Sequence, residues 1–209
     1  MRPLSHYFAP ELQREFTEAL PDLRAQLGHL PFVRRDRQLG VGGETFRAYR
    51  NWIYPPSATY RTWATQVCQR LSPQYLQQQL ISQTAFDAWH TSLATSVQDQ
   101  WRVTEGKDLS FAHQHKLVDL FIKWLSGYDF GTPIIAAGFE AHAKCALDRQ
   151  TLKKLNECLS TALPMPAPSM GHILTKTTYL FCQELIAEFS MSCGGTPLLF
   201  DYFAWKRGG

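Results

Sequence analysis

Residues 110–160, SFAHQHKLVDLFIKWLSGYDFGTPIIAAGFEAHAKCALDRQTLKKLNECLS, hold the clearest helical periodicity of the chain and its densest group of reactive side chains. Over residues 110–126 the apolar side chains cover a wide arc of a helical wheel, and Lys116, Asp119 and Lys123 fill the remaining side. A helix with so wide an apolar face packs into a core along most of its circumference. The stretch therefore predicts a mostly buried helix that carries a short row of charges.

Asp148 stands at the start of the next helical pattern. Leu152, Leu155 and Leu159 recur three and four residues apart behind it, which predicts one buried stripe. An aspartate directly before such a stripe is a preferred N-cap, because its carboxylate accepts hydrogen bonds from the unpaired amide groups of the first turn. We therefore expect Asp148 to cap a helix.

The rest of the chain shows mostly the same helical spacing. One set of large side chains predicts a stripe that faces the core, namely Phe86, Trp89, Leu93, Val97 and Trp101. The exception is the region of residues 32–54, where Gly40, Gly42 and Gly43 supply turns and where we expect one small β-hairpin. These patterns predict an all-α protein, a compact helical bundle that forms a single domain over residues 1–209.

Composition excludes several classes of protein. With 209 residues, of which 44% are hydrophobic and 19% charged, the chain can bury a core and is not disordered. No run of side chains approaches the ~20 apolar residues that cross a bilayer. The five cysteines are odd in number and widely spaced, so we expect reduced thiols, no disulfide framework and a cytoplasmic location.

The net charge of +3 is too small to identify a nucleic-acid-binding protein by itself. Its distribution is more informative, because basic side chains gather in two places. One group consists of Arg34, Arg35, Arg37, Arg47 and Arg50, and the other, on the helix predicted after Asp148, of Arg149, Lys153 and Lys154. Both groups are candidate contacts for an anionic partner.

Glu140, His142, Cys145 and Cys158 offer oxygen, nitrogen and sulfur atoms of the kinds that bind zinc. Structural zinc sites show two tight pairs of ligands, whereas only His142 and Cys145 form such a pair here. We therefore interpret the histidine as a surface residue and the cysteines as core thiols, and we expect neither a metal ion nor a cofactor.

Two interpretations of the lysines remain open. Lys116 and Asp119 are three residues apart and Asp119 and Lys123 are four, so on a solvated helix face they would form ion pairs with one another. A lysine amine beside a carboxylate can also perform Schiff-base or acid–base chemistry if burial lowers its pKa. In that second interpretation the candidate catalytic residues are Asp148, Lys116 and Lys123.

Three segments in order, FDAWHTSL, SFAHQHKLVDLFIKWL and HAKCALDRQTL, resemble a group of small bacterial helical proteins with no established activity. Those proteins carry a helix with a glutamine and a lysine, a second lysine seven residues on, and then a segment like Cys-Pro-Ile-Asp. Here that segment is Cys145, Ala146, Leu147 and Asp148, with alanine in place of proline. The resemblance covers roughly residues 80–160.

More remotely, a lysine-bearing helix followed by an aspartate that caps the next helix is similar to the helix-hairpin-helix DNA glycosylases. Enzymes of that family act on a base that is flipped out of the duplex. The similarity implies that Asp148 is the catalytic carboxylate. It also implies that Lys116 or Lys123 is the nucleophile or a phosphate contact.

The same similarity implies that the arginines of residues 34–50 clamp DNA and that Trp52 and Tyr54 wedge into the duplex or stack on a base. The sequence thus favours a bacterial protein that acts on duplex DNA, in its sharpest form a glycosylase-like hydrolase or lyase. The alternative is a non-catalytic helical module that binds a protein partner, for example in an antiphage defence or toxin–antitoxin system.

Overall fold

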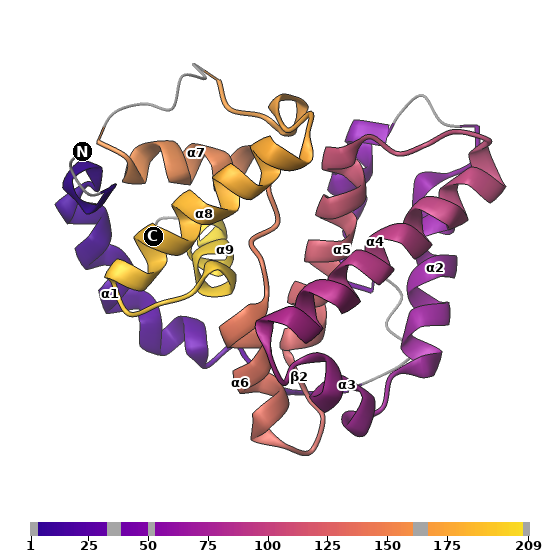
Figure 1. Cartoon of the computed structure of the whole chain (residues 1–209), viewed down its shortest axis with the longest axis horizontal. Helices are drawn as coiled ribbons and strands as arrows, with labels where there is room; N and C mark the ends of the chain where they lie inside the picture. The colour runs from indigo at the N-terminus through magenta and orange to yellow at the C-terminus, as the bar shows by residue number, and fades with distance from the viewer. Residues whose placement is uncertain (1–3, 33–38, 50–52, 161–166, 207–209) are drawn as a thin grey trace.

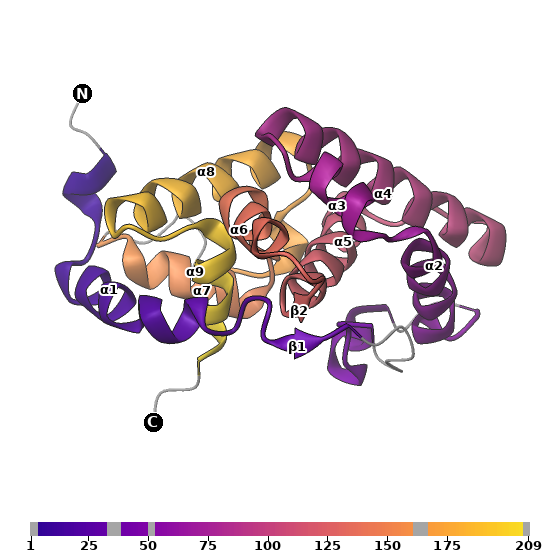
Figure 2. The same ribbon diagram turned by 90° about the horizontal axis from the view of Figure 1, so that it is seen from below.

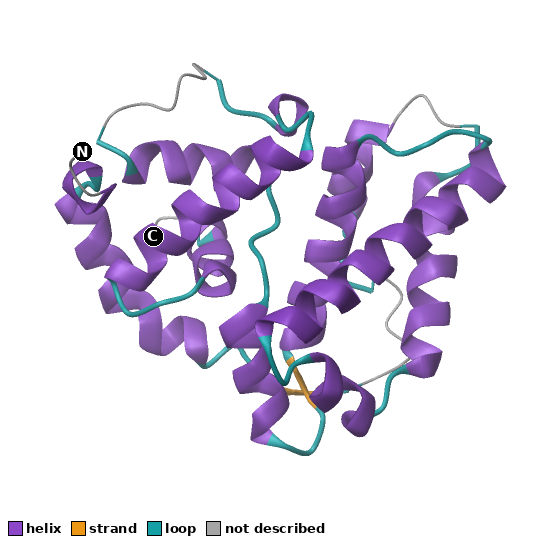
Figure 3. Cartoon of the chain, in the orientation of Figure 1, coloured by secondary structure: helices purple, strands orange, loops and turns teal. Residues whose placement is uncertain are grey.

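The computed structural model describes residues 4–32, 39–49, 53–160 and 167–206 and confirms the all-α prediction, with 72% of these described residues helical. The α-helices in this part of the chain are α1 (Pro10–Arg24), α2 (Pro56–Arg70), α3 (Pro73–Gln79), α4 (Gln83–Glu105), α5 (Phe111–Ser126), α6 (Pro133–His142), α7 (Arg149–Cys158), α8 (Lys176–Ser192) and α9 (Pro197–Trp205). Three short 3-10 helices are η1 (Leu4–Tyr7), η2 (Gly43–Tyr49) and η3 (Met170–His172). Figure 3 shows how little of the described chain is extended.

Local side chains determine where the helices around the site begin and end. The hydroxyl of Ser110 accepts the amide of His113 at the start of α5, and Thr175 accepts the amide of Thr178 at the start of α8. These bonds satisfy amide groups that the first turn leaves unpaired. Gly106 ends α4 in the left-handed conformation, with φ of 64°. As a result α4 and α5 are separate helices joined by a short connection.

The described residues contain one very small sheet, which lies outside the region of the expected hairpin. β1 (Leu30–Pro31) pairs in parallel with β2 (Tyr128–Asp129), which follows α5. The described residues 39–49 contain no strand, and η2 occupies the end of this segment. The hairpin prediction was wrong for these residues, whose apolar side chains, including Leu39 and Tyr49, are buried in the helical core. Residues 33–38 and 50–52 of the predicted region lie outside the described chain. Tertiary packing has overridden the turn pattern.

The helices that build two hydrophobic clusters form two groups side by side, and Figures 1 and 2 show these groups from two directions. The first cluster is built mainly from α2, α3, α4, α5 and α6, and the second mainly from α1, α7, α8 and α9. Leu27 and Tyr202 pack against both. Helix α5 lies at the border, because Ala112 belongs to the second cluster whereas Leu117 and Phe121 belong to the first. The polar side chains of α5 therefore meet the second cluster.

The stripe predicted on α4 faces the core, since its five members are all buried, namely Phe86, Trp89, Leu93, Val97 and Trp101. The apolar tail of the chain forms α9, which packs Phe200 and Phe203 into the second cluster. Trp205 at the end of α9 is half exposed. Helix α9 thus brings both buried and accessible side chains to the border between the clusters.

All five cysteines are free thiols, and only Cys193 is not fully buried. Among the helices that the structure describes, none is long and apolar enough to cross a membrane.

Candidate active site between the two helix clusters

The lysines of α5 reach across to the second cluster and do not pair along their own helix. Lys116 Nζ lies 3.8 Å from Asp148 Oδ2 at the start of α7. Lys123 forms an ion pair with Asp201 of α9. The predicted pairs of both lysines with Asp119 were wrong, because this face is not solvated. Only 12% of the Lys116 side chain and 16% of the Lys123 side chain are exposed, so each lysine binds a carboxylate of the packed neighbour.

Asp148 caps α7, as predicted, and its carboxylate is held in a fixed position. Its Oδ1 accepts the amides of Gln150 at 2.8 Å and Thr151 at 3.0 Å. The Thr151 hydroxyl in return accepts the amide of Asp148 at 2.8 Å, which completes a capping box. The cap occupies Oδ1, whereas Oδ2 is the oxygen nearest to Lys116. The two ends of this carboxylate thus have different partners.

The second lysine, Lys123, is the cation of a buried ion pair. Asp201 accepts Lys123 on Oδ1 and the amide of Ala146 on Oδ2, the latter at 2.6 Å. The ammonium also lies 4.4 Å from the ring centre of Tyr202. Burial opposes the charge of Lys123, but Asp201 outweighs it and raises the lysine pKa. Burial also raises the pKa of Asp201, although Lys123 counteracts this. The pair is therefore a strongly coupled element of the border.

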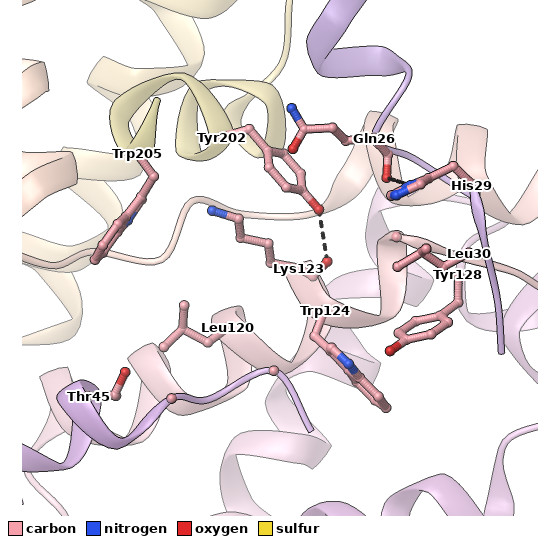
Figure 4. Close-up of a pocket in the computed structure, with 13 residues that line it drawn as sticks. Gln26, His29, Leu30, Thr45, Leu120, Lys123, Trp124, Tyr128, Tyr202 and Trp205 are labelled. Carbon is pink, nitrogen blue, oxygen red and sulfur yellow. Dashed lines mark hydrogen bonds between the residues drawn. The ribbon is translucent and has the colours of Figure 1, made fainter. Parts of the chain in front are cut away.

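A pocket of about 490 Å³ opens beside this ion pair, with walls from α5, α9 and the segments around β1 and β2. Four aromatic side chains line it, namely Trp124, Tyr128, Tyr202 and Trp205. Figure 4 shows Lys123 and Tyr202 near its centre, with the Tyr202 hydroxyl donating to the Lys123 carbonyl at 3.2 Å. Gln26 and His29 add polar groups at one side. A pocket of this volume with flat aromatic walls suits a planar ligand.

The pocket and the Lys116–Asp148 pair share one face of α5. Lys116, Leu120 and Lys123 are spaced at i, i+4 and i+7, and residues at such spacing lie above one another on a helix. Leu120 and Lys123 line the pocket. Lys116 therefore stands one turn beyond the pocket wall on the same face of the helix.

Asp119 has a structural partner on each side of the border. His90 Nε2 of α4 lies 2.7 Å from Asp119 Oδ1, and the Tyr179 hydroxyl of α8 donates to Oδ2 at 2.8 Å. All three side chains are almost completely buried. Burial first, and then the neighbouring Asp119 carboxylate, raise the pKa of Tyr179 well above its usual value. This network ties α4, α5 and α8 together.

The basic residues predicted near the N-terminus fall largely outside the described chain, namely Arg34, Arg35, Arg37, Arg50 and also Trp52. Arg47 belongs to η2, and the prediction for its side chain likewise lies outside the described residues. Tyr54 is 55% exposed, and its amide donates to Glu105 Oε1 at 2.7 Å. Tyr54 is thus anchored by its backbone, with its ring accessible.

The basic residues predicted on α7 do lie on that helix. Arg149, directly after the cap residue, is exposed. Lys153 and Lys154 lie 3.6 Å and 3.0 Å from Glu157, so one carboxylate offsets part of their charge. Arg149 directly follows Asp148 in the sequence. Among the described contacts it has no such acidic partner.

The side chains considered as zinc ligands have other surroundings. Arg24 Nε donates to Glu140 at 2.7 Å, and His142 Nδ1 lies 3.2 Å from Gln83 Oε1. Burial raises the pKa of the thiols of Cys145 and Cys158, which favours the protonated form. Within the described residues no group of three or more His, Cys, Asp or Glu side chains is arranged to hold a metal ion.

Sequence reasoning missed Asp201, the carboxylate that completes the Lys123 pair. A signal was present, because Asp201 is the single acid in the apolar run TPLLFDYFAWK. An acid inside such a run is buried only with a cation or several donors. The aromatic wall residues Trp124 and Tyr202 carried no comparable signal, since aromatic side chains at helical spacing are usually part of a core.

Comparisons of the chain with protein-family models, with curated proteins and with solved structures found no match.

Proposed function

We propose that the protein removes a base from DNA, with Lys116 and Asp148 as the reacting side chains. The observation that carries the proposal is the approach of Lys116 Nζ to Asp148 Oδ2, 3.8 Å apart, from two different helix clusters. Both side chains keep a small exposed fraction, 12% and 7%. An amine and a fixed carboxylate that converge at a border between two packed units form a nucleophile and a charge-stabilising group.

The chemistry needs one bond broken and one formed at the sugar. The departing base leaves C1′ with the bonding electron pair and takes up the proton that the Lys116 ammonium gives up. The free amine then forms a bond to C1′, so the positive charge remains on the lysine nitrogen and the base departs neutral. The Asp148 carboxylate stabilises the positive charge that develops on the sugar in between. Its capping bonds hold it in place, so it needs little rearrangement during the reaction.

The aromatic pocket supports this proposal because it gives the extruded base a place to bind. Its volume of about 490 Å³ falls within the range of about 300–1,000 Å³ that small-molecule sites occupy. Trp124 and Tyr202 offer ring faces, and an extruded base stacks on such faces. Leu120 on the pocket wall lies one helical turn from Lys116. A base in the pocket would therefore leave its sugar near the amine.

The direct test is base release from short DNA duplexes that each carry one uracil, oxidised purine or alkylated purine. We expect release from at least one duplex, and a loss of at least about 100-fold in Asp148→Asn. Asparagine is as good an N-cap as aspartate, so the variant keeps the helix start and loses the charge. Asp99→Asn, which changes an exposed acid on α4, is the matched control and should keep full activity. Absence of both base release and duplex binding at low salt would overturn the proposal.

A second candidate, a non-catalytic interaction module, is favoured by one feature of α8. Leu180 and Phe181 of this helix are 44% and 53% exposed, and Leu174 just before it is 76% exposed. Exposed apolar side chains that gather on one element are typical of protein-binding surfaces. If this candidate is correct, Phe181→Ser abolishes co-purification of a protein partner, whereas Asp148→Asn leaves it unchanged.

A further inference from the structure

A second pocket, of about 430 Å³, lies between α4, α5 and α8. Five nitrogen-bearing side chains line it, His90 and Gln114 among them, and the other three come from three separate elements. These three are His115 of α5, Lys144 from the connection between α6 and α7, and Lys176, the first residue of α8. The rings of Phe111 and Tyr179 form apolar walls beside them. This pocket shares no lining residue with the aromatic pocket at Lys123.

The imidazole ring of His115 packs among other rings. Its ring centre lies 4.1 Å from that of Phe111 and 4.7 Å from that of Tyr179, and it stacks on His90. Among the described residues, no hydrogen-bond partner lies within reach of its buried Nδ1. An imidazole with one nitrogen unsatisfied is unusual in a protein interior. The protein itself therefore does not use the full hydrogen-bonding capacity of this side chain.

Two lysines and one acid, Asp87, are among the side chains that line this pocket. Burial lowers the pKa of His115 to about 4, and although Asp119 acts in the opposite direction, the charges of Lys144 and Lys176 lower it further. Lys144 Nζ lies 2.8 Å from Asp87, whose side chain is 47% exposed. One acid thus faces two lysines.

The start of α8 is a further feature that favours an anion. Lys176 occupies the first position of the helix, where the unpaired amide groups and the helix dipole also favour an anion. Because α8 spans 17 residues, it is long enough for this effect. Lys176 itself is exposed, so its ammonium can move toward a ligand.

We propose that this pocket binds a phosphate group, with Lys144, Lys176 and His115 as its contacts. A phosphate monoester carries about two negative charges and several strong acceptor oxygens, which match two ammonium groups and an imidazole from three directions. A carboxylate has one charge and two oxygens and leaves part of this set unused. The ring walls of Phe111 and Tyr179 accommodate the organic part that carries the phosphate. The ligand is therefore a small phosphomonoester.

The test measures binding of inorganic phosphate to the full chain by titration calorimetry at constant ionic strength. We expect saturable binding that weakens at least about tenfold in Lys144→Gln and in Lys176→Gln. Lys107→Gln, an exposed lysine outside the pocket, is the matched control and should bind as the unaltered protein does. Absence of saturable binding below about 10 mM phosphate, or unchanged binding in the double variant, would overturn the proposal.

A variant that strengthens binding guards against a trivial loss of structure. Asp87→Asn removes the acid beside Lys144, so we expect it to tighten phosphate binding several-fold. Weaker binding in Asp87→Asn would count against the assignment. Competition identifies the ligand class: we expect a nucleoside monophosphate to displace inorganic phosphate, whereas displacement by a short DNA duplex alone would contradict a phosphomonoester site. These measurements do not depend on base release. Phosphate binding can therefore be absent while base release is observed, and base release can be absent while phosphate binds.

Discussion

His90 Nε2 lies 2.7 Å from Asp119 Oδ1, and this contact joins α4 to α5 at the border of the two clusters. Tyr179 binds the other oxygen of the same carboxylate. Truncation by Asp119→Ala leaves two buried polar groups without their acceptor, so we expect a loss of about 3 kcal/mol in the free energy of unfolding.

Urea denaturation measures this loss. The control is Asp99→Ala, because Asp99 is an exposed acid whose only described partner is Arg102 on the same helix. It should change the free energy of unfolding by less than about 0.5 kcal/mol. Equal effects of the two substitutions would contradict a structural role for the Asp119 network.

The buried pair of Lys123 and Asp201 gives a second prediction. Lys123→Met leaves Asp201 buried without its cation and should destabilise the fold by about 3–5 kcal/mol. In the double variant Lys123→Met with Asp201→Asn, the asparagine can still accept the amide of Ala146 and carries no charge. We therefore expect the double variant to recover more than half of the lost stability in thermal or urea unfolding. A double variant less stable than Lys123→Met alone would show that the ion pair is not the reason for the loss.

Much of the fold was predictable, because the helical stripes directly reflect burial. The stripe from Phe86 to Trp101 faces the core, and Asp148 caps α7, as the spacing and the residue type indicate. The path of residues 39–49, which form no strand, was not predictable in the same way. Glycines permit a turn but do not specify strands, and the path of residues 39–49 follows from side chains such as Tyr49 that pack on distant helices.

The candidate site was only half predictable. The lysines of α5 and Asp148 were found from residue type and position, but one of the two interpretations assigned the partners of the lysines within one helix. A helix that is apolar over most of its circumference is packed on most sides, so its few charges are buried as well. They then pair with the neighbour that covers them. Which neighbour does so, Asp148 for Lys116 and Asp201 for Lys123, depends on tertiary contacts that spacing does not encode.

Stability should depend on pH through His115. Burial lowers its pKa in the folded protein to about 4 from the model-peptide value of 6.5. Between these two values the unfolded chain binds a proton that the folded chain does not. The free energy of unfolding therefore falls as the pH falls from about 6.5 toward 4, and is fully restored above that window.

Replacement of His115 tests this dependence. His115→Gln should flatten the slope of unfolding free energy against pH over the same window, measured by urea denaturation at several pH values. A lowered pKa of His113, caused by burial and by Lys116, leaves a residual slope in this variant. An unchanged slope in His115→Gln would contradict the prediction.

Gly40 gives a prediction about the aromatic pocket. Its φ is 85°, and a side-chain carbon at this position would overlap Trp124 and lie 3.1 Å from the Leu120 carbonyl oxygen. Gly40→Ala should therefore lower stability by at least about 2 kcal/mol and displace Trp124, which lines the pocket. Base release by this variant should also fall, because Trp124 forms part of the pocket for the base.

Gly42 is the matched control, since it also lines the pocket but a side-chain carbon there meets nothing within 4 Å. Gly42→Ala should change both stability and base release little. Full base release by Gly40→Ala, with the substitution tolerated, would argue against the pocket as the site of the base.

The most direct test of the central claim is reductive trapping on a DNA duplex that contains one abasic site. The Lys116 amine condenses with the C1′ aldehyde of the opened sugar, water leaves, and borohydride reduces the resulting imine to a stable secondary amine. We predict a covalent protein–DNA adduct that maps to Lys116, that persists in Lys107→Gln and that disappears in Lys116→Gln. No adduct, or an adduct of equal yield in Lys116→Gln, would contradict the assignment of Lys116 as the nucleophile.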